Sequence, residues 1–226
     1  MNNLVSLDVS IKTYPDSMAR EVFTEELCSS SAFLPNLLAL KTDDVYVAMA
    51  IIPGRPVYSV CVNDSVPEAL RCQFIQSLAS SKSPISQLQI RFDVADNEST
   101  AATFHTIAAK FSQVTALCVE FHIVNPSERP LKWTTLNDII HRMKPALSSL
   151  YMLHTMGMTI YPEPCRTDKE VEEVEGAVAL FRQHANALRR IEFKWHMWDA
   201  AQGLRSIQSI HQSLRGQWAF REGAGT

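Results

Sequence analysis

Apolar and polar residues alternate over residues 85–92, and this alternation predicts a strand with one buried face. Leu88, Ile90 and Phe92 are apolar, whereas Gln89 and Arg91 between them are polar. Side chains alternate between the two faces of a strand, so one face is expected to be dry and the other wet. The same alternation returns at residues 114–121 and 188–195, each time after a segment with helical spacing. We therefore expect one strand–helix unit to repeat along the chain.

Further elements follow from the same two periodicities and from the turn residues between them. We expect strands at residues 4–11, 33–42, 57–62, 85–92, 114–123, 147–152 and 188–195. Helices are expected from residue 16, then over residues 45–52, 66–80, 96–111, 134–146 and 169–187, with another at 199–214. Loops are expected at residues 63–65, 125–130 and 157–168.

The spacing of the strands points to a solenoid. Their first apolar residues lie at positions 4, 37, 57, 85, 114, 147 and 188, which are 33, 20, 28, 29, 33 and 41 residues apart. The central intervals match the period of 20–29 residues that is typical of leucine-rich repeats. Each unit resembles the Leu-x-x-Leu-x-Leu strand of that family, although the Asn that usually follows is absent from most units.

The predicted fold is therefore an α/β solenoid of the leucine-rich-repeat kind, with parallel strands on the concave face and helices on the convex face. We expect about seven irregular units over residues 1–198. Residues 199–226 are expected to form a C-terminal cap, because a solenoid must cover the open end of its core.

A closer resemblance is carried by Phe33-Leu34-Pro35-Asn36-Leu37, by residues 51–57 and by residues 188–193. These segments resemble the leucine-rich-repeat region of fungal F-box-like proteins, and the likeness in layout covers most of the chain. Such proteins are substrate receptors of cullin-type ubiquitin ligases, in which the F-box holds a Skp adaptor and the repeats hold the target. The resemblance extends to the repeats of these proteins and not to their F-box. It therefore implies that this chain is the substrate-recognition domain. A Skp-type adaptor is expected only if the full gene product carries an F-box.

Composition and charge exclude several other classes of function. The 21 Lys and Arg against 24 Asp and Glu give a net charge of -3, which would not attract nucleic acid. The longest apolar run, residues 45–52, is too short to cross a membrane, so a cytoplasmic or nuclear protein is expected. The 5 cysteines include no CxxC pair, which argues against a disulfide framework and a zinc site.

The predicted binding site is the row of side chains that point away from the helices. Tyr and Arg side chains are frequent anchors of protein interfaces, and both occur in this row. A solvated strand face without a partner is the alternative interpretation, because any exposed sheet face needs polar residues. The residues expected to bind a protein partner are Gln87, Gln89, Arg91, Glu120, His122, Tyr151, Arg190, Glu192 and Lys194.

An enzyme is not expected, and we predict no catalytic residue, metal ligand or cofactor. The 7 histidines are scattered, and neither HExxH nor GxSxG nor a phosphate-binding GxxxxGK occurs. His196 near Glu192 and Asp199 could form an acid–base or metal cluster, but a surface histidine is the better interpretation. Two alternatives stay open: a repeat protein with a structural role only, and a small hydrolase whose histidine and carboxylate groups converge from distant positions.

Overall fold

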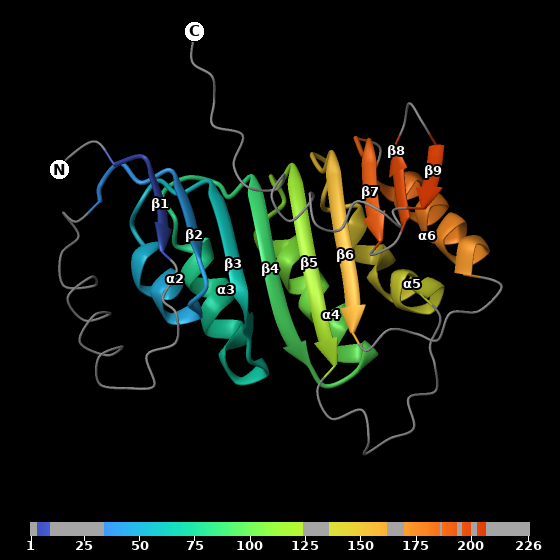
Figure 1. Cartoon of the computed structure of the whole chain (residues 1–226), viewed down its shortest axis with the longest axis horizontal. Coiled ribbons are helices and arrows are strands. Elements are labelled where there is room, and N and C mark those ends of the chain that lie inside the picture. The colour runs from blue at the N-terminus through green and yellow to red at the C-terminus, as the bar shows by residue number, and fades with distance from the viewer. Residues whose placement is uncertain are drawn as a thin grey trace, which may run out of the picture.

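The computed structural model describes residues 4–9, 34–123, 136–161, 170–185, 187–193, 196–199 and 203–206. These residues form one open sheet whose strands lie side by side in chain order (Figure 1). Seven strands run parallel, and β8 and β9 then pair antiparallel. The strands are β1 (Ser6–Val9), β2 (Ala39–Thr42), β3 (Ser59–Val66), β4 (Gln87–Val94), β5 (Ala116–Ile123), β6 (Thr155–Tyr161), β7 (Arg190–Phe193), β8 (His196–Asp199) and β9 (Gly203–Ser206).

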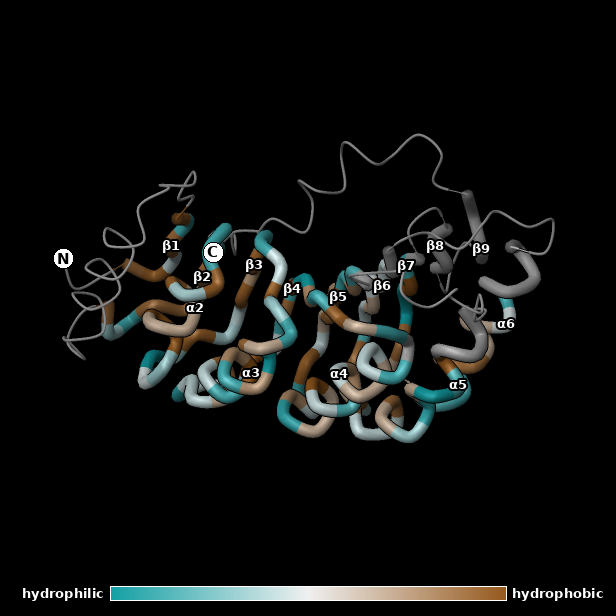
Figure 2. The backbone as a smooth tube through the Cα atoms, turned by 90° about the horizontal axis from the view of Figure 1, so that it is seen from below, coloured by the Kyte–Doolittle hydropathy of each residue, from teal (hydrophilic) through white to brown (hydrophobic). Residues whose placement is uncertain are grey.

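From β2 to β7, a helix connects each strand to the next, and the described helices cover one face of the sheet. Figure 1 shows them behind the strands, and Figure 2, turned by 90°, shows them beneath the strands. The predicted α/β class and the predicted parallel strands are therefore confirmed. The helices are α2 (Val45–Ile51), α3 (Arg71–Ala79) after the short 3₁₀ helix η1 (Glu68–Leu70), α4 (Asn97–Lys110), α5 (Leu136–Leu147) and α6 (Glu170–His184).

A repeated hydrogen-bond pattern sets the step from each strand to the next. At the start of β5, for example, the N–H groups of Thr115 and Ala116 both donate to the carbonyl of Ser86, at 2.7 and 3.0 Å. Equivalent pairs of N–H groups begin every strand from β2 to β7, and the distance along the chain from one step to the next is 33, 20, 28, 29, 39 and 35 residues. The connections between strands therefore differ in length, while the pairing of each strand with the next starts in the same way. The accepting carbonyls belong to Val5, Leu38, Tyr58, Ser86, Thr115 and His154.

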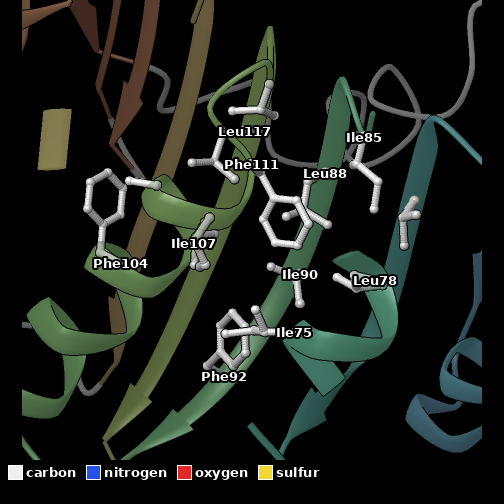
Figure 3. Packing of buried hydrophobic residues seen from close by; sticks show 14 of the residues in the cluster. Ile75, Leu78, Ile85, Leu88, Ile90, Phe92, Phe104, Ile107, Phe111 and Leu117 are labelled. Atoms are coloured by element: carbon white, nitrogen blue, oxygen red, sulfur yellow. The ribbon is translucent and has the colours of Figure 1, made fainter. Parts of the chain in front are cut away.

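The core lies between the sheet and its helices. In-register apolar side chains form a continuous buried row across β2 to β7, because parallel strands place equivalent residues side by side. Figure 3 shows Leu88 and Ile90 of β4 in one layer with Ile75 and Leu78 of α3 and with Phe111. The row consists of Leu40, Val60, Leu88, Leu117, Met156 and Ile191.

Aromatic rings continue this stacking from one unit to the next. The ring of Phe92 stacks on that of Phe121 with centroids 6.3 Å apart, and it meets Phe74 edge-on at 6.4 Å. All three side chains are fully buried. Such contacts contribute roughly 0.5–1.5 kcal/mol each beyond the area that they bury. They link α3, β4 and β5 into one packed layer.

Side-chain caps explain where two of the helices begin. The carboxylate of Asp44 accepts hydrogen bonds from the N–H groups of Tyr46 and Val47, at 2.7 and 3.3 Å, so α2 begins directly after it. Asp96 accepts from the N–H of Ser99 at 2.8 Å, and the Ser99 hydroxyl accepts from the N–H of Asp96 in return. Caps of this kind satisfy N–H groups that the helix leaves unpaired. The predicted short buried helix at residues 45–52 and the helix start at Asp96 are confirmed.

The proline-rich break after α2 depends on two residues. Gly54 has a φ of 72°, in the left-handed region that glycine adopts without steric cost. Arg55 is buried, and its guanidinium donates to the carbonyl of Ile51 at the C-terminal end of α2. Its own backbone carbonyl accepts from the N–H of Lys82 at 2.8 Å. Arg55 thereby ties the end of α2 to the segment before β4.

The predicted strand over residues 147–152 is wrong. Leu147 is the last residue of α5, and the next strand, β6, begins only at Thr155. Leu147, Leu150, Leu153 and Met156 recur every three residues, so apolar spacing alone fits a strand start at more than one place. The predicted loop from residue 157 is wrong for the same reason over residues 157–161, which belong to β6.

The correct alignment of this unit follows from a turn that several units share. The N–H of Leu153 donates to the carbonyl of Leu150 at 3.0 Å, as Val114 does to Phe111 and Leu188 to Ala185. Leu153, fully buried, is thus the equivalent of Val114 and Leu188.

Two further predictions are corrected. Residues 63–65 lie inside β3 rather than in a loop, because the strand absorbs this polar run by a register shift between Cys61 and Ser65. The helix expected from residue 66 therefore starts later, with η1 at Glu68 and α3 at Arg71. The helix expected at residues 199–214 is wrong over residues 203–206, which form β9.

Other predictions lie wholly or partly outside the described residues. Among them are the helix from residue 16, the loop at 125–130, residues 162–168 of the loop expected at 157–168, and the part of the expected tail helix beyond residue 206. The division into a repeat array over residues 1–198 and a cap over 199–226 stays a prediction.

Replacing Leu153 with Ala should lower the free energy of unfolding by roughly 2–5 kcal/mol, because it leaves a cavity in the core just before β6. Tyr151 is the matched control: its side chain is 60% exposed, so Tyr151→Ala should change the free energy by less than about 0.5 kcal/mol. Urea unfolding followed by circular dichroism measures both. Equal effects of the two substitutions would contradict the alignment of this unit.

Candidate interaction face of the sheet

The face of the sheet opposite the helices carries aligned rows of polar and small side chains, and we call it the polar face. On β4 and β5 its residues alternate with the buried ones, whereas Ala39 of β2 and Ser59 and Cys61 of β3 are themselves buried. The first row runs through Ser6, Ala39, Ser59, Gln87, Ala116, Thr155 and Arg190. The second row runs through Asp8, Lys41, Cys61, Gln89, Cys118, Gly157 and Glu192. The third row runs through Ser65, Arg91, Glu120 and Thr159, and a fourth begins at Asp93 and His122.

Most of the predicted binding residues lie together on this face. The structure places on it Gln87, Gln89, Arg91, Glu120, His122, Arg190 and Glu192. Tyr151 does not belong to it, because it lies in the turn between α5 and β6 and not in a strand. Lys194 lies outside the described residues. Residues of β6 occupy the position on the sheet that was expected for Tyr151. The prediction missed them because it put the strand of this unit at residues 147–152.

An ion pair joins β4 to β5 near the centre of the face. Arg91 donates to one oxygen of Glu120 through both Nε and Nη2, at 2.9 and 2.7 Å. The two residues are register partners, and their side chains are 30% and 23% exposed. A partly exposed pair of this kind contributes roughly 0–1 kcal/mol to stability. Its main effect is to fix the positions of both side chains.

Two further ion pairs lie toward the ends of the sheet. Lys41 of β2 donates to Asp8 of β1 at 2.9 Å, and this hydrogen bond is the main reason that the pKa of Lys41 is raised. On β7, Arg190 Nη2 lies 3.8 Å from Glu192 Oε2. Sequence reasoning missed the Lys41–Asp8 pair, since the pairing of β1 with β2 across more than thirty residues cannot be deduced from residue types alone.

Neutral hydrogen bonds fix other side chains of the face. The hydroxyl of Ser59 donates to the carboxamide oxygen of Gln87 at 3.1 Å, across β3 and β4. The hydroxyl of Ser65 donates to the carboxylate of Asp93. The register shift in β3 makes Arg91 the register partner of Ser65, so this second contact reaches two residues further along β4.

The cysteines of the second row are packing residues rather than nucleophiles. Burial raises the pKa of Cys61 to about 11, despite the opposing effect of Lys41. Burial also raises the pKa of Cys118, and the charges of Glu120 and Glu192 add to the shift. Both thiols are therefore protonated at neutral pH, and a thiol is a poor nucleophile and metal ligand. Within the described residues, no group of three or more His, Cys, Asp or Glu side chains could hold a metal ion.

The surroundings of His122, near the end of β5, also shift the pKa of its ring. The pKa of His122 is lowered, first because burial disfavours the charged ring and second because Arg91 repels it. Glu120 and Asp93 oppose this shift. The ring is therefore neutral at pH 7.

Comparisons of the chain with protein-family models, curated proteins and solved structures found no match. In the part of the chain that the structure describes, no helix is long and apolar enough to cross a membrane.

Gly157 and Cys118 should be energetically coupled. A Cβ at Gly157 would lie 3.0 Å from the Sγ of Cys118, so Gly157→Ala forces the thiol to move. The double variant Gly157→Ala/Cys118→Ala should lose less unfolding free energy than the two single variants lose together, by about 0.5–3 kcal/mol. Thermal and urea unfolding of the four proteins of this cycle give the coupling energy. Strict additivity would mean that the two side chains do not share this space.

The stability of the fold should fall on acidification in a way that depends on His122. The unfolded state takes up a proton near pH 6.5, whereas the folded state takes it up only at lower pH. Stability from this group is thus present above the unfolded pKa and is lost as the pH falls from there through the lower folded pKa. His122→Gln should flatten the loss of unfolding free energy between about pH 7.5 and 5.5. His141→Gln, at an exposed position of α5, controls for removal of a histidine, and an unchanged slope in His122→Gln would refute the assignment.

Proposed function

We propose that this chain is a non-catalytic protein-interaction scaffold that binds a partner protein on its polar face. The observation that carries the proposal is the in-register display of side chains across seven parallel strands, with the described helices packed on the opposite face. A sheet face of this kind offers a broad, rigid surface whose side chains are already ordered by hydrogen bonds and ion pairs. Pre-ordering lowers the entropy lost when a partner binds.

The architecture that we infer is a solenoid of the leucine-rich-repeat kind. Strand order supports this reading: the parallel strands follow one another without reversal, whereas a doubly wound sheet reverses its order and carries helices on both faces. The uneven steps of 20 to 39 residues agree with irregular repeats whose connections differ in length. Solenoids of stacked strand–helix units use such extended faces for binding.

The finer proposal is that the chain is the substrate-recognition repeat domain of an F-box-like ubiquitin-ligase receptor. Its support is the resemblance of residues 33–37, 51–57 and 188–193 to that family, together with the serial strand order. The target would occupy the polar face. A Skp-type adaptor would bind only where the full gene product supplies an F-box. We further propose a location in the cytoplasm or nucleus, with no nucleic acid, membrane or cofactor in its function, and the net charge of -3 and the short apolar runs support this.

Site-specific photocrosslinking in cells tests the proposal. A photoreactive residue at position 91, at the centre of the polar face, should give a discrete covalent adduct with another protein, because a bound partner covers that position. The same residue at Gln73, exposed on α3, is the matched control and should give none. Mass spectrometry of the adduct identifies the partner, and scoring of Skp-type adaptors among co-purified proteins tests the ligase reading separately. Equal crosslinking from both positions, or none from position 91, would refute binding at the polar face.

A further inference from the structure

The centre of the polar face is free of charge. On β4, β5 and β6, the first two rows hold only uncharged residues, and we call these six residues the neutral block. Ser59 and Cys61 extend the block onto β3. Three spacings between neighbouring strands give this region a width of about 14 Å. The neutral block consists of Gln87, Gln89, Ala116, Cys118, Thr155 and Gly157.

Ion pairs flank the neutral block on three sides. Lys41–Asp8 lies on its β1–β2 side, Arg190–Glu192 lies on β7, and Arg91–Glu120 lies in the next row. Each of these cations therefore already faces an anion of the same surface. Protein interfaces have the same plan, with charges depleted at the centre and a polar rim around it.

The residues of the block are not equally accessible. Gly157 is buried because the Sγ of Cys118 occupies the space beside it, and Ala116 carries a single carbon. On one side stand the longer carboxamides of Gln87 and Gln89, and on the other stands Arg190. Gln87 is exposed, whereas Gln89, Ala116 and Thr155 are half-buried. A small or uncharged group of a partner would meet amide and hydroxyl groups here without displacing a charge.

We infer that recognition is centred on the neutral block, and that its partner is a polypeptide surface of near-zero net charge. This inference rests on the proposed function and specifies its partner. A strongly acidic partner would need unpaired cations, yet Lys41, Arg91 and Arg190 are all paired with anions of the same face. A strongly basic partner would have to take Asp8, Glu120 or Glu192 from those same pairs. An uncharged partner leaves the rim intact, and association without electrostatic steering depends only weakly on salt.

Selection from a phage-displayed library of random peptides of about 12 residues tests this inference. The bait is the full chain, and the counter-selection bait is Gln89→Lys, which places a charge in the block. Ala116→Lys serves as a second block variant if Gln89→Lys loses its thermal unfolding transition. Gln73→Lys on α3 is the matched control, with the same change on the opposite side of the molecule. Enriched peptides are then synthesised, and their dissociation constants are measured by isothermal titration calorimetry.

Enriched peptides should carry a net charge close to zero. Their affinity should change less than about threefold between roughly 50 and 500 mM NaCl. It should fall at least about tenfold on Gln89→Lys or Ala116→Lys, and it should be unchanged on Gln73→Lys. Arg91→Ala, at the rim, should cost less than either block variant.

The remaining outcomes separate the two proposals. Peptides that are highly charged, that bind with steep salt dependence, or that depend on Arg91 more than on the block would overturn the neutral-block inference and leave binding at the polar face standing. Peptides that bind independently of Gln89, Ala116 and Arg91, or a failure to enrich any peptide, would count against both.

Discussion

The structure depends on one backbone contact that is repeated at every step of the sheet. Two successive N–H groups at the start of a strand share the carbonyl of the residue just before the preceding strand, from β2 through β7. This contact fixes the register, and the register decides which residues face the helices. The buried row from Leu40 to Ile191 and the aligned rows of the polar face are both consequences of it. Because the contact lies at the start of each strand, the connections between strands can change length without disturbing the sheet.

Sequence reasoning succeeded where a unit contains both periodicities and a clear stop signal. Leu88, Ile90 and Phe92 alternate with polar residues, and Asp96 begins the next helix with a side-chain cap, so both β4 and α4 could be predicted. It failed where the apolar spacing is degenerate. From Leu147 to Met156, the spacing of three residues is shared by the end of a helix, a turn and the start of a strand. Only the hydrogen bonds between strands distinguish these alternatives, and such contacts are made by residues far apart in the chain.

The candidate site shows the same division. Alternation alone assigns Gln89, Arg91 and Glu120 to the wet side of their strands, and the structure agrees. Which side chains become neighbours across strands is a different matter. The pairing of Lys41 with Asp8 and the position of Gly157 beside Cys118 both follow from register between strands that are separated by connections of uneven length. The register shift in β3 could not be deduced either, because a polar run such as Asn63, Asp64 and Ser65 is equally typical of a loop.

The change of direction at β8 has a consequence for assembly. An open parallel sheet can in principle add strands from other molecules at its ends, and natural proteins limit such growth by making edge strands short or by altering their geometry. Here β7 is paired by an antiparallel strand, and β9 continues in that hairpin with only four residues. A further copy that met this end would face a short strand belonging to a hairpin rather than the next position of a parallel stack. Among the described strands, the hairpin therefore ends the run of parallel pairing at β7.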